Sequence, residues 1–281
     1  MFPIGDDNPQ RGVPFVTYAI LSMCVLAFIW QISPESGGIQ ASALMFGMIP
    51  ADLFGLGGAT AGAAAPETPV PEWMTLFTSQ FLHGGIGHLA GNMLYLWIFA
   101  DNIELAMGRV RFVLFYLLCG AIAALAQGLL APASTIPLIG ASGAISGVLG
   151  AYLVLFPHGR VQVLFVPLPI PIVRILVVPA VLVLGLWFAM QFFSGLFSQA
   201  GEGGVAFWAH VGGFVAGMAL VMVFRRPGVA LWQGRRSPRF DARRTNRSGP
   251  WDTRDSRETG DPRGPRGRQG PRGRQGPWGP R

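Results

Sequence analysis

The sequence predicts an all-α polytopic membrane protein in which six helices cross the bilayer. Of its 281 residues, 51% are hydrophobic and only 12% are charged, a composition more apolar than that of a soluble globular domain. The apolar residues also gather into six stretches that approach the ~20 residues needed to cross about 30 Å of hydrocarbon. These stretches cover residues 15–32, 85–101, 110–130, 140–157, 174–197 and 205–224.

The positions of the arginines predict the orientation of these helices. Up to residue 224, every arginine lies before the first stretch, at the turn between the second and third, or at the connection between the fourth and fifth. The loops 33–84, 131–139 and 198–204 contain no basic residue. By the positive-inside rule, both termini are expected to be cytoplasmic. The absence of lysine, with abundant Ala, Gly and Pro, favours a bacterial source and therefore a plasma (inner) membrane location.

Three regions are expected along the chain: a short cytoplasmic N-terminus (1–14), a six-helix membrane domain (15–224) and a basic cytoplasmic tail (225–281). No small-residue cleavage site follows the first stretch, so the mature chain is expected to begin near Met1. The tail holds sixteen arginines and few apolar residues, which predicts disorder. Contact with anionic lipid headgroups is favoured over nucleic-acid binding for the tail.

Two loops have distinctive compositions. The long outer loop between the first two stretches is apolar over residues 43–54 and is expected to lie on or partly in the outer leaflet, whereas 55–72 reads as a disordered Gly/Ala/Pro segment. On the inner side, 161–172 is apolar but rich in proline, which excludes a helix interior and predicts an extended segment. The fifth membrane helix is expected to start at Arg174.

Four polar side chains stand out within the predicted membrane helices: His88, Asn92, Ser142 and His210. Polar groups in hydrocarbon are costly and are therefore candidates for function. Counting about 1.5 Å per residue from the inner ends of their helices, Ser142 and His210 lie about 22 Å above the inner boundary, and His88 lies at nearly the same depth. Asn92 is one turn deeper on the face that carries His88.

These residue types suit acyl transfer at a serine. Ser142 stands in Gly140-Ala-Ser-Gly143, at a predicted helix start where free backbone N–H groups stabilise negative charge. A serine hydroxyl needs a base to take its proton, and His210 is the histidine at that depth on a parallel helix. His88 and Asn92 are candidate donors to the oxyanion of a tetrahedral intermediate. The neighbouring glycines would let the fourth and sixth helices approach closely.

Other titratable residues have simpler interpretations. His83 is expected to be a loop or interfacial histidine near the outer surface. Asp101 and Glu104, beside Arg109 and Arg111, are expected to form an ion-pair and capping cluster at the inner turn. There is no His-Glu-x-x-His motif for a zinc ion and no pair of membrane aspartates for an aspartyl mechanism, so no metal site is expected.

Three motifs, found in this order, resemble those of the rhomboid family of intramembrane serine proteases. They are Leu82-His83-Gly84-Gly85 followed by His88-x-x-x-Asn92, then Gly140-x-Ser142-Gly143, and finally Ala209-His210-x-x-Gly213-x-x-x-Gly217. The resemblance implies a six-helix rhomboid-like bundle and a Ser142–His210 catalytic dyad, with His88, Asn92, Gly140 and Gly143 at the oxyanion and substrate site. It also implies cleavage of single-span transmembrane substrates near the outer face.

The resemblance leaves open how the His210 ring is oriented, and two alternative functions also have to be considered. Ser146 occupies the position at which many members carry an aromatic residue that stacks on the histidine, so the sequence does not tell how His210 is oriented. The first alternative is a catalytically inactive rhomboid-like protein that binds membrane clients. The second is a small transporter or channel, which the apolar lower halves of the fourth and sixth helices disfavour.

Overall fold

The computed structural model describes residues 2–8, 12–56, 69–165, 174–197 and 205–233. Two compact units are distinguished, Met1–Phe240 and Asp241–Arg281, and the second lies wholly outside the described residues. Disorder was predicted for residues 55–72 and for the tail. Most of these residues, 57–68 and 234–281, also lie outside the described ranges. The longer helices are α1 (Phe15–Gln31), α5 (Ile86–Met107), α6 (Arg109–Leu130), α7 (Ser142–Leu155), α8 (Ala180–Phe197) and α9 (Phe207–Phe224).

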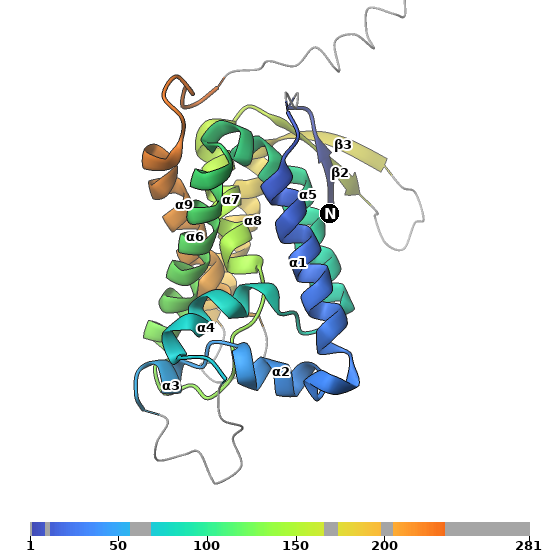
Figure 1. Cartoon of the computed structure of the whole chain (residues 1–281). Coiled ribbons are helices and arrows are strands. Elements are labelled where there is room, and N and C mark those ends of the chain that lie inside the picture. Colours follow the sequence, from blue (N-terminus) through green and yellow to red (C-terminus); the bar gives the residue numbers. More distant parts are fainter. Residues whose placement is uncertain (1, 9–11, 57–68, 166–173, 198–204, 234–281) are drawn as a thin grey trace, which may run out of the picture. The chain divides into compact units, whose positions relative to one another are not determined.

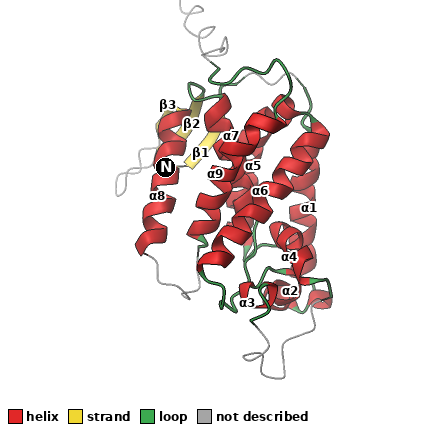
Figure 2. Cartoon of the chain, turned by 90° about the vertical axis from the view of Figure 1, so that its left-hand side faces the viewer, coloured by secondary structure: helices red, strands yellow, loops and turns green. Residues whose placement is uncertain are grey.

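The six longer helices pack side by side, with short helices at one end of the bundle and strands at the other (Figures 1 and 2). The short helices are α2 (Gly38–Phe46), α3 (Pro50–Leu53) and α4 (Glu72–Thr78), and the strands are β1 (Phe2–Asp6), β2 (Arg160–Phe165) and β3 (Arg174–Pro179). Helix α7 packs against α5, α6 and α9, and nearly all of its residues are buried. A helix that is apolar all round is expected to occupy such a central place.

Each of the six predicted stretches overlaps one of the longer helices, although α5 continues past residue 101 to Met107. By length and hydropathy, α6, α8 and α9 are long and apolar enough to cross a membrane, while α1 and α7 are apolar but shorter. Helix α5 has 22 residues and carries Asp101 and Glu104 near its last turns. The described part of the chain is therefore mostly helical, with several apolar helices in one bundle.

The expectation of an all-α chain was wrong at the end of the bundle where the strands lie. Strands β1, β2 and β3 form an antiparallel sheet in that order. The fifth long helix begins at Ala180 rather than at Arg174, because 174–179 pair with β2. This segment is rich in β-branched residues, and Val178 precedes a proline, which disfavours the helical conformation. The extended segment predicted from Val161 onward is confirmed for its described residues, as β2.

Partly buried hydrogen bonds connect the N-terminal strand to the helices. One carboxylate oxygen of Asp6 accepts hydrogen bonds from the Tyr152 hydroxyl (2.6 Å) and from the Asn102 side-chain amide (2.8 Å). Asn8 also donates to the Tyr152 hydroxyl (2.6 Å). The chain before α1 is thus joined to α5 and α7.

Glu104 caps helix α1. Its carboxylate accepts hydrogen bonds from the backbone N–H groups of Val16 and Thr17 and from the Thr17 hydroxyl, at 2.8–3.0 Å. These N–H groups have no partner within the helix, so the buried carboxylate stabilises the helix start. The capping role expected for Glu104 is confirmed. Of the two arginines expected in the same cluster, Arg109 lies over the Phe15 ring at 4.3 Å, and Arg111 donates to a backbone carbonyl.

Order extends beyond the expected domain boundary at residue 224. The Arg226 N–H donates to the carbonyl of Ala106 (2.9 Å), and the Gln233 N–H donates to that of Leu155 (2.8 Å). Residues 225–233 therefore run back along the ends of α5 and α7.

Helices α7 and α9 meet through glycines. A Cβ atom at Gly217 would collide with the carbonyl oxygen of Gly147, and one at Gly213 would collide with that of Gly143. From the opposite side, a Cβ at Gly150 would collide with the carbonyl of Phe214. The two backbones are in direct contact, the arrangement that small residues permit between membrane helices.

Replacing Gly217 with valine is expected to destabilise the fold by about 3 kcal/mol or more, because backbone atoms rather than a flexible side chain would have to move. Thermal unfolding in detergent micelles measures the effect. Gly185→Ala is the matched control, since no atom lies within 4 Å of the added Cβ and alanine favours the helix by about 0.5–1 kcal/mol. Equal melting temperatures for the two variants would contradict this account of the α7–α9 contact.

Candidate active site

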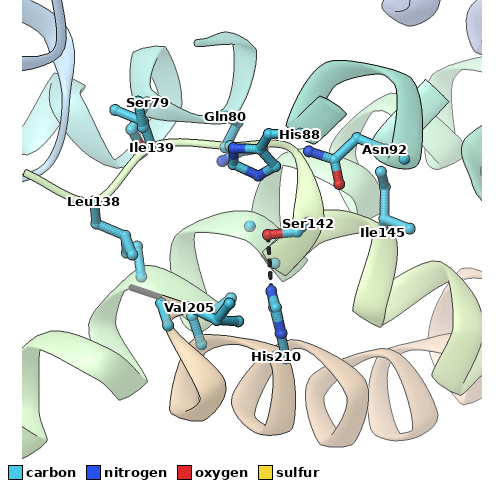
Figure 3. A pocket seen from close by; sticks show the side chains of 18 of the residues that line it. Ser79, Gln80, His88, Asn92, Leu138, Ile139, Ser142, Ile145, Val205 and His210 are labelled. Carbon is cyan, nitrogen blue, oxygen red and sulfur yellow. Dashed lines mark hydrogen bonds between the residues drawn. The ribbon is translucent and has the colours of Figure 1, made fainter. Parts of the chain in front are cut away.

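A cavity of about 580 Å³ opens at the start of α7. It lies toward the end of the bundle that carries the short helices, because the chain leading into α7 pairs with the α2–α3 turn through Met48 and Leu138. All six residues predicted at the site line this cavity, which brings together parts of α5, α7 and α9 (Figure 3): His88, Asn92, Gly140, Ser142, Gly143 and His210.

The structure brings Ser142 and His210 into direct contact. Ser142 is the first residue of α7, and no side chain caps this helix start. Its Oγ lies 2.9 Å from Nε2 of His210, which projects from the first turns of α9. The pair is separated by 68 positions in the sequence and meets because the glycines of α7 and α9 allow close approach. The first N–H groups of α7, beginning at Ser142, have no partner within the helix.

Two residues of α8 hold the other side of the His210 ring. Gln191 places its Oε1 2.8 Å from Nδ1 of His210. The ring of Trp187 lies against the imidazole, with centroids 5.9 Å apart and an interplanar angle of 36°. Sequence reasoning missed both residues. Gln191 is a polar residue in an apolar stretch, the same signal that identified the other four, and Trp187 lies one turn away on the same helical face.

The contact with Trp187 answers the question that Ser146 left open. The Ser146 hydroxyl donates to the carbonyl of Ser142 within its own helix (2.6 Å). The aromatic ring beside the histidine comes instead from α8.

His88 faces the Ser142 hydroxyl across Gly140. The Gly84 N–H donates to Nδ1 of His88 (3.3 Å), so in the neutral ring the proton is on Nε2. A Cβ at Gly140 would lie 2.9 Å from Nε2 of His88 and 3.6 Å from Oγ of Ser142. Because glycine has no side chain, the space between the His88 ring and the Ser142 hydroxyl stays open. The N–H of Gly140 itself donates to the carbonyl of Ser79 (2.9 Å).

Asn92 lies one turn along α5 from His88 and is 7% exposed. Its Nδ2 is buried and has no hydrogen-bond partner among the described residues. Figure 3 shows His88 and Asn92 on the same side of Ser142, opposite His210. An unpaired buried donor beside a cavity is costly unless a ligand or intermediate accepts its hydrogen bond.

His83 lies in the loop before α5, as expected, but its burial was not expected. His83 is fully buried, because its loop folds back against α1, where the His83 N–H donates to Oε1 of Gln31 (2.8 Å). Burial, with a smaller contribution from His88, lowers the pKa of His83 to about 4. Its ring meets the His88 ring edge-on at 5.2 Å and supports that residue. Among the described residues, no cluster of three His, Cys, Asp or Glu side chains suits a metal ion.

A family model described as the rhomboid domain matches residues 70–227. This is more than half of the chain, and it includes the helices that carry the cavity residues. The chain belongs to the rhomboid family. It is accordingly a multi-pass membrane protein with a mostly helical bundle.

Individual relatives match shorter parts of this rhomboid chain. The rhomboid protease GluP of Bacillus subtilis is 34% identical over 145 residues, 51% of this chain and 25% of that protein. The mitochondrial presenilin-associated rhomboid-like protein of Homo sapiens is 36% identical over 95 residues (33% and 25%). The putative rhomboid protease YdcA of B. subtilis is 38% identical over 82 residues (29% and 41%). The chain spans between a quarter and two fifths of the length of these relatives.

Proposed function

We propose that this rhomboid is an intramembrane serine endopeptidase in which Ser142 is the nucleophile and His210 the general base. The observation that carries the proposal is the 2.9 Å contact between Oγ of Ser142 and Nε2 of His210 inside the cavity. A nucleophile and a base within hydrogen-bond reach, with a third group holding the base, are the recognisable parts of covalent acyl transfer.

The reaction follows from these positions. His210 Nε2 takes the proton of the Ser142 hydroxyl as Oγ attacks the carbonyl carbon of the scissile peptide bond. The tetrahedral intermediate collapses, the C–N bond breaks, and the proton moves from His210 to the leaving amine. A water molecule, deprotonated by the same nitrogen, then attacks the ester carbonyl. The C–Oγ bond breaks, His210 returns the proton to Oγ of Ser142, and the second product leaves as a carboxylic acid.

The oxyanion of the intermediate is proposed to lie between Ser142 and α5. The Nε2–H of His88 and the unpaired Nδ2–H of Asn92 are available there, as are the first-turn N–H groups of α7 at Ser142 and Gly143. Since the Gly140 N–H is already hydrogen-bonded, Gly140 contributes space rather than a donor. Donors fixed in place before the reaction stabilise developing charge without reorganisation.

The substrates are proposed to be single-span transmembrane proteins, cut near the outer face of a bacterial plasma membrane. The six-span arrangement, the cytoplasmic termini and the contact of the tail (234–281) with anionic headgroups belong to this proposal. Its support is the distribution of arginines along the sequence and the cavity at the end of the bundle opposite the sheet. No nucleic acid and no cofactor take part.

Cleavage of a single-span reporter in liposomes is the first test. The wild type is expected to cut, while Ser142→Ala and His210→Ala lose activity by a factor of about 10⁴ or more, because neither residue can substitute for the other. Ser146→Ala is the control, since it removes a hydroxyl one turn away that bonds only within α7, and it should cut like the wild type. Cleavage by all variants alike would contradict the dyad, and a silent wild type that still binds the reporter would favour a client-binding protein.

Removing an oxyanion donor should slow the chemical step without weakening substrate binding. Asn92→Ala is expected to lower kcat roughly 10²-fold with little change in KM. Steady-state kinetics on the liposome reporter measure both constants. An unchanged kcat would remove Asn92 from the site, and a rise in KM alone would assign it to substrate binding.

The orientation can be tested with a membrane-impermeant maleimide. The native Cys24 and Cys119 are fully buried, so background labelling should be low. A cysteine at Ala133, exposed in the loop after α6, is expected to react in intact cells, whereas one at His158, exposed after α7, should react only after permeabilisation. The reverse pattern would invert the proposed topology.

A further inference from the structure

Gln191 is the polar group of α8 that touches the proposed base, and its role follows from how it does so. Its Oε1 lies 2.8 Å from Nδ1 of His210, while Nε2 of the same ring lies 2.9 Å from Oγ of Ser142. We propose that Gln191 is a positioning residue that fixes both the orientation and the tautomer of His210. This inference rests on the proposed protease function.

The tautomer follows from the chemistry of the two atoms. An amide oxygen can only accept a hydrogen bond, so the imidazole nitrogen facing it carries the proton. A neutral imidazole has one N–H, and its other nitrogen, Nε2, therefore presents a lone pair. That lone pair faces the Ser142 hydroxyl, as a general base requires. The opposite tautomer would point an N–H at the serine and could not accept its proton.

Gln191 supplies this orientation where no carboxylate is present. Helices α6, α7, α8 and α9 contain no Asp or Glu, and among the described residues the lining of the cavity includes His88 and Tyr95 of α5 but no carboxylate. A carboxylate beside Nδ1 would orient the ring but would also stabilise the imidazolium. A neutral amide orients the ring without adding a charge to an apolar environment, where an unpaired charge is costly.

The same helix supplies the second support of the ring. Trp187, one turn from Gln191, packs on both His210 and Phe214 of α9. Of the three helices α6, α8 and α9, α8 is otherwise the most exposed, and only 17% of its 18 residues are buried. The orientation of the base thus depends on α8 lying against α9.

Nitrogen NMR of the full chain in nanodiscs, labelled with ¹⁵N-histidine, tests the tautomer directly. The chain has four histidines, and the His210 signals are those that disappear in His210→Ala. At neutral pH, His210 is expected to carry its proton on Nδ1 in the wild type and to shift toward the Nε2–H form in Gln191→Met, which matches the side chain in length but lacks the oxygen. A proton on Nε2 in the wild type would overturn the proposal.

Kinetics provide the second measurement. Gln191→Met is expected to lower kcat roughly 10- to 100-fold, the range typical of losing a group that orients a functional histidine. In Gln191→Glu the carboxylate keeps the acceptor and favours the imidazolium, so activity is retained at high pH and the acid limb of kcat/KM moves up by about one pH unit or more. Met190→Leu, at a neighbouring exposed position, is the control and should match the wild type.

The outcomes separate the two proposals. An unchanged kcat in Gln191→Met, or an unmoved acid limb in Gln191→Glu, would overturn the positioning role even if the wild type is an active protease. If Gln191→Met fails to fold, the acid limb of Gln191→Glu decides. If the wild type cuts no reporter, the protease proposal fails while the NMR result still decides whether Gln191 sets the tautomer.

Discussion

The site depends on the direct backbone contact between α7 and α9. Ser142 and His210 lie in the first turns of two different helices, and only a very short distance between those helices lets a serine hydroxyl reach an imidazole. The glycines at 213 and 217 supply that distance, because any side chain there would strike the carbonyls of α7. In a bilayer the lipid tails are as apolar as the helices, so this close packing takes over the organising role that the hydrophobic effect has in soluble proteins.

Other parts of the molecule pack around this contact and stabilise the residues near it. Near the start of α7, the Gly84 N–H donates to His88, and Gly140 leaves space for the His88 ring beside the serine. At the far end, β1 and residues 225–233 tie the chain segments before α1 and after α9 to α5 and α7. Along the side, α8 supplies Trp187 and Gln191 to the base. Ser142 lies on α7, nearly all of which is buried, whereas the residues that support His210 lie on α8, the most exposed of α6, α8 and α9. The bundle therefore holds the nucleophile more firmly than it holds the base.

The sequence predicted the helices well because apolar stretches of helical length leave few alternatives in a membrane. It also predicted which residues meet in the cavity, since His88, Ser142 and His210 come out at one depth by counting residues. It failed where contacts between distant segments decide. Residues 174–179 were predicted as the first turns of an apolar helix, but they pair with β2, which is joined in turn to β1 at the N-terminus, and so form a strand. The burial of His83 within its loop was not predicted, because it depends on a contact with Gln31, 52 positions away. Gln191 was overlooked although its polarity was visible, since its partner could not be read from spacing.

The most direct measurement of the central claim is covalent labelling of the full chain in liposomes with a fluorophosphonate, which reacts with serines whose hydroxyl is activated by a base. Peptide mapping by mass spectrometry then locates the adduct. The account predicts a single adduct at Ser142 that is lost in His210→Ala while the variant keeps the wild-type melting temperature. No adduct on folded wild type, or equal labelling of Ser142 without His210, would contradict the claim that these two residues form a working nucleophile and base.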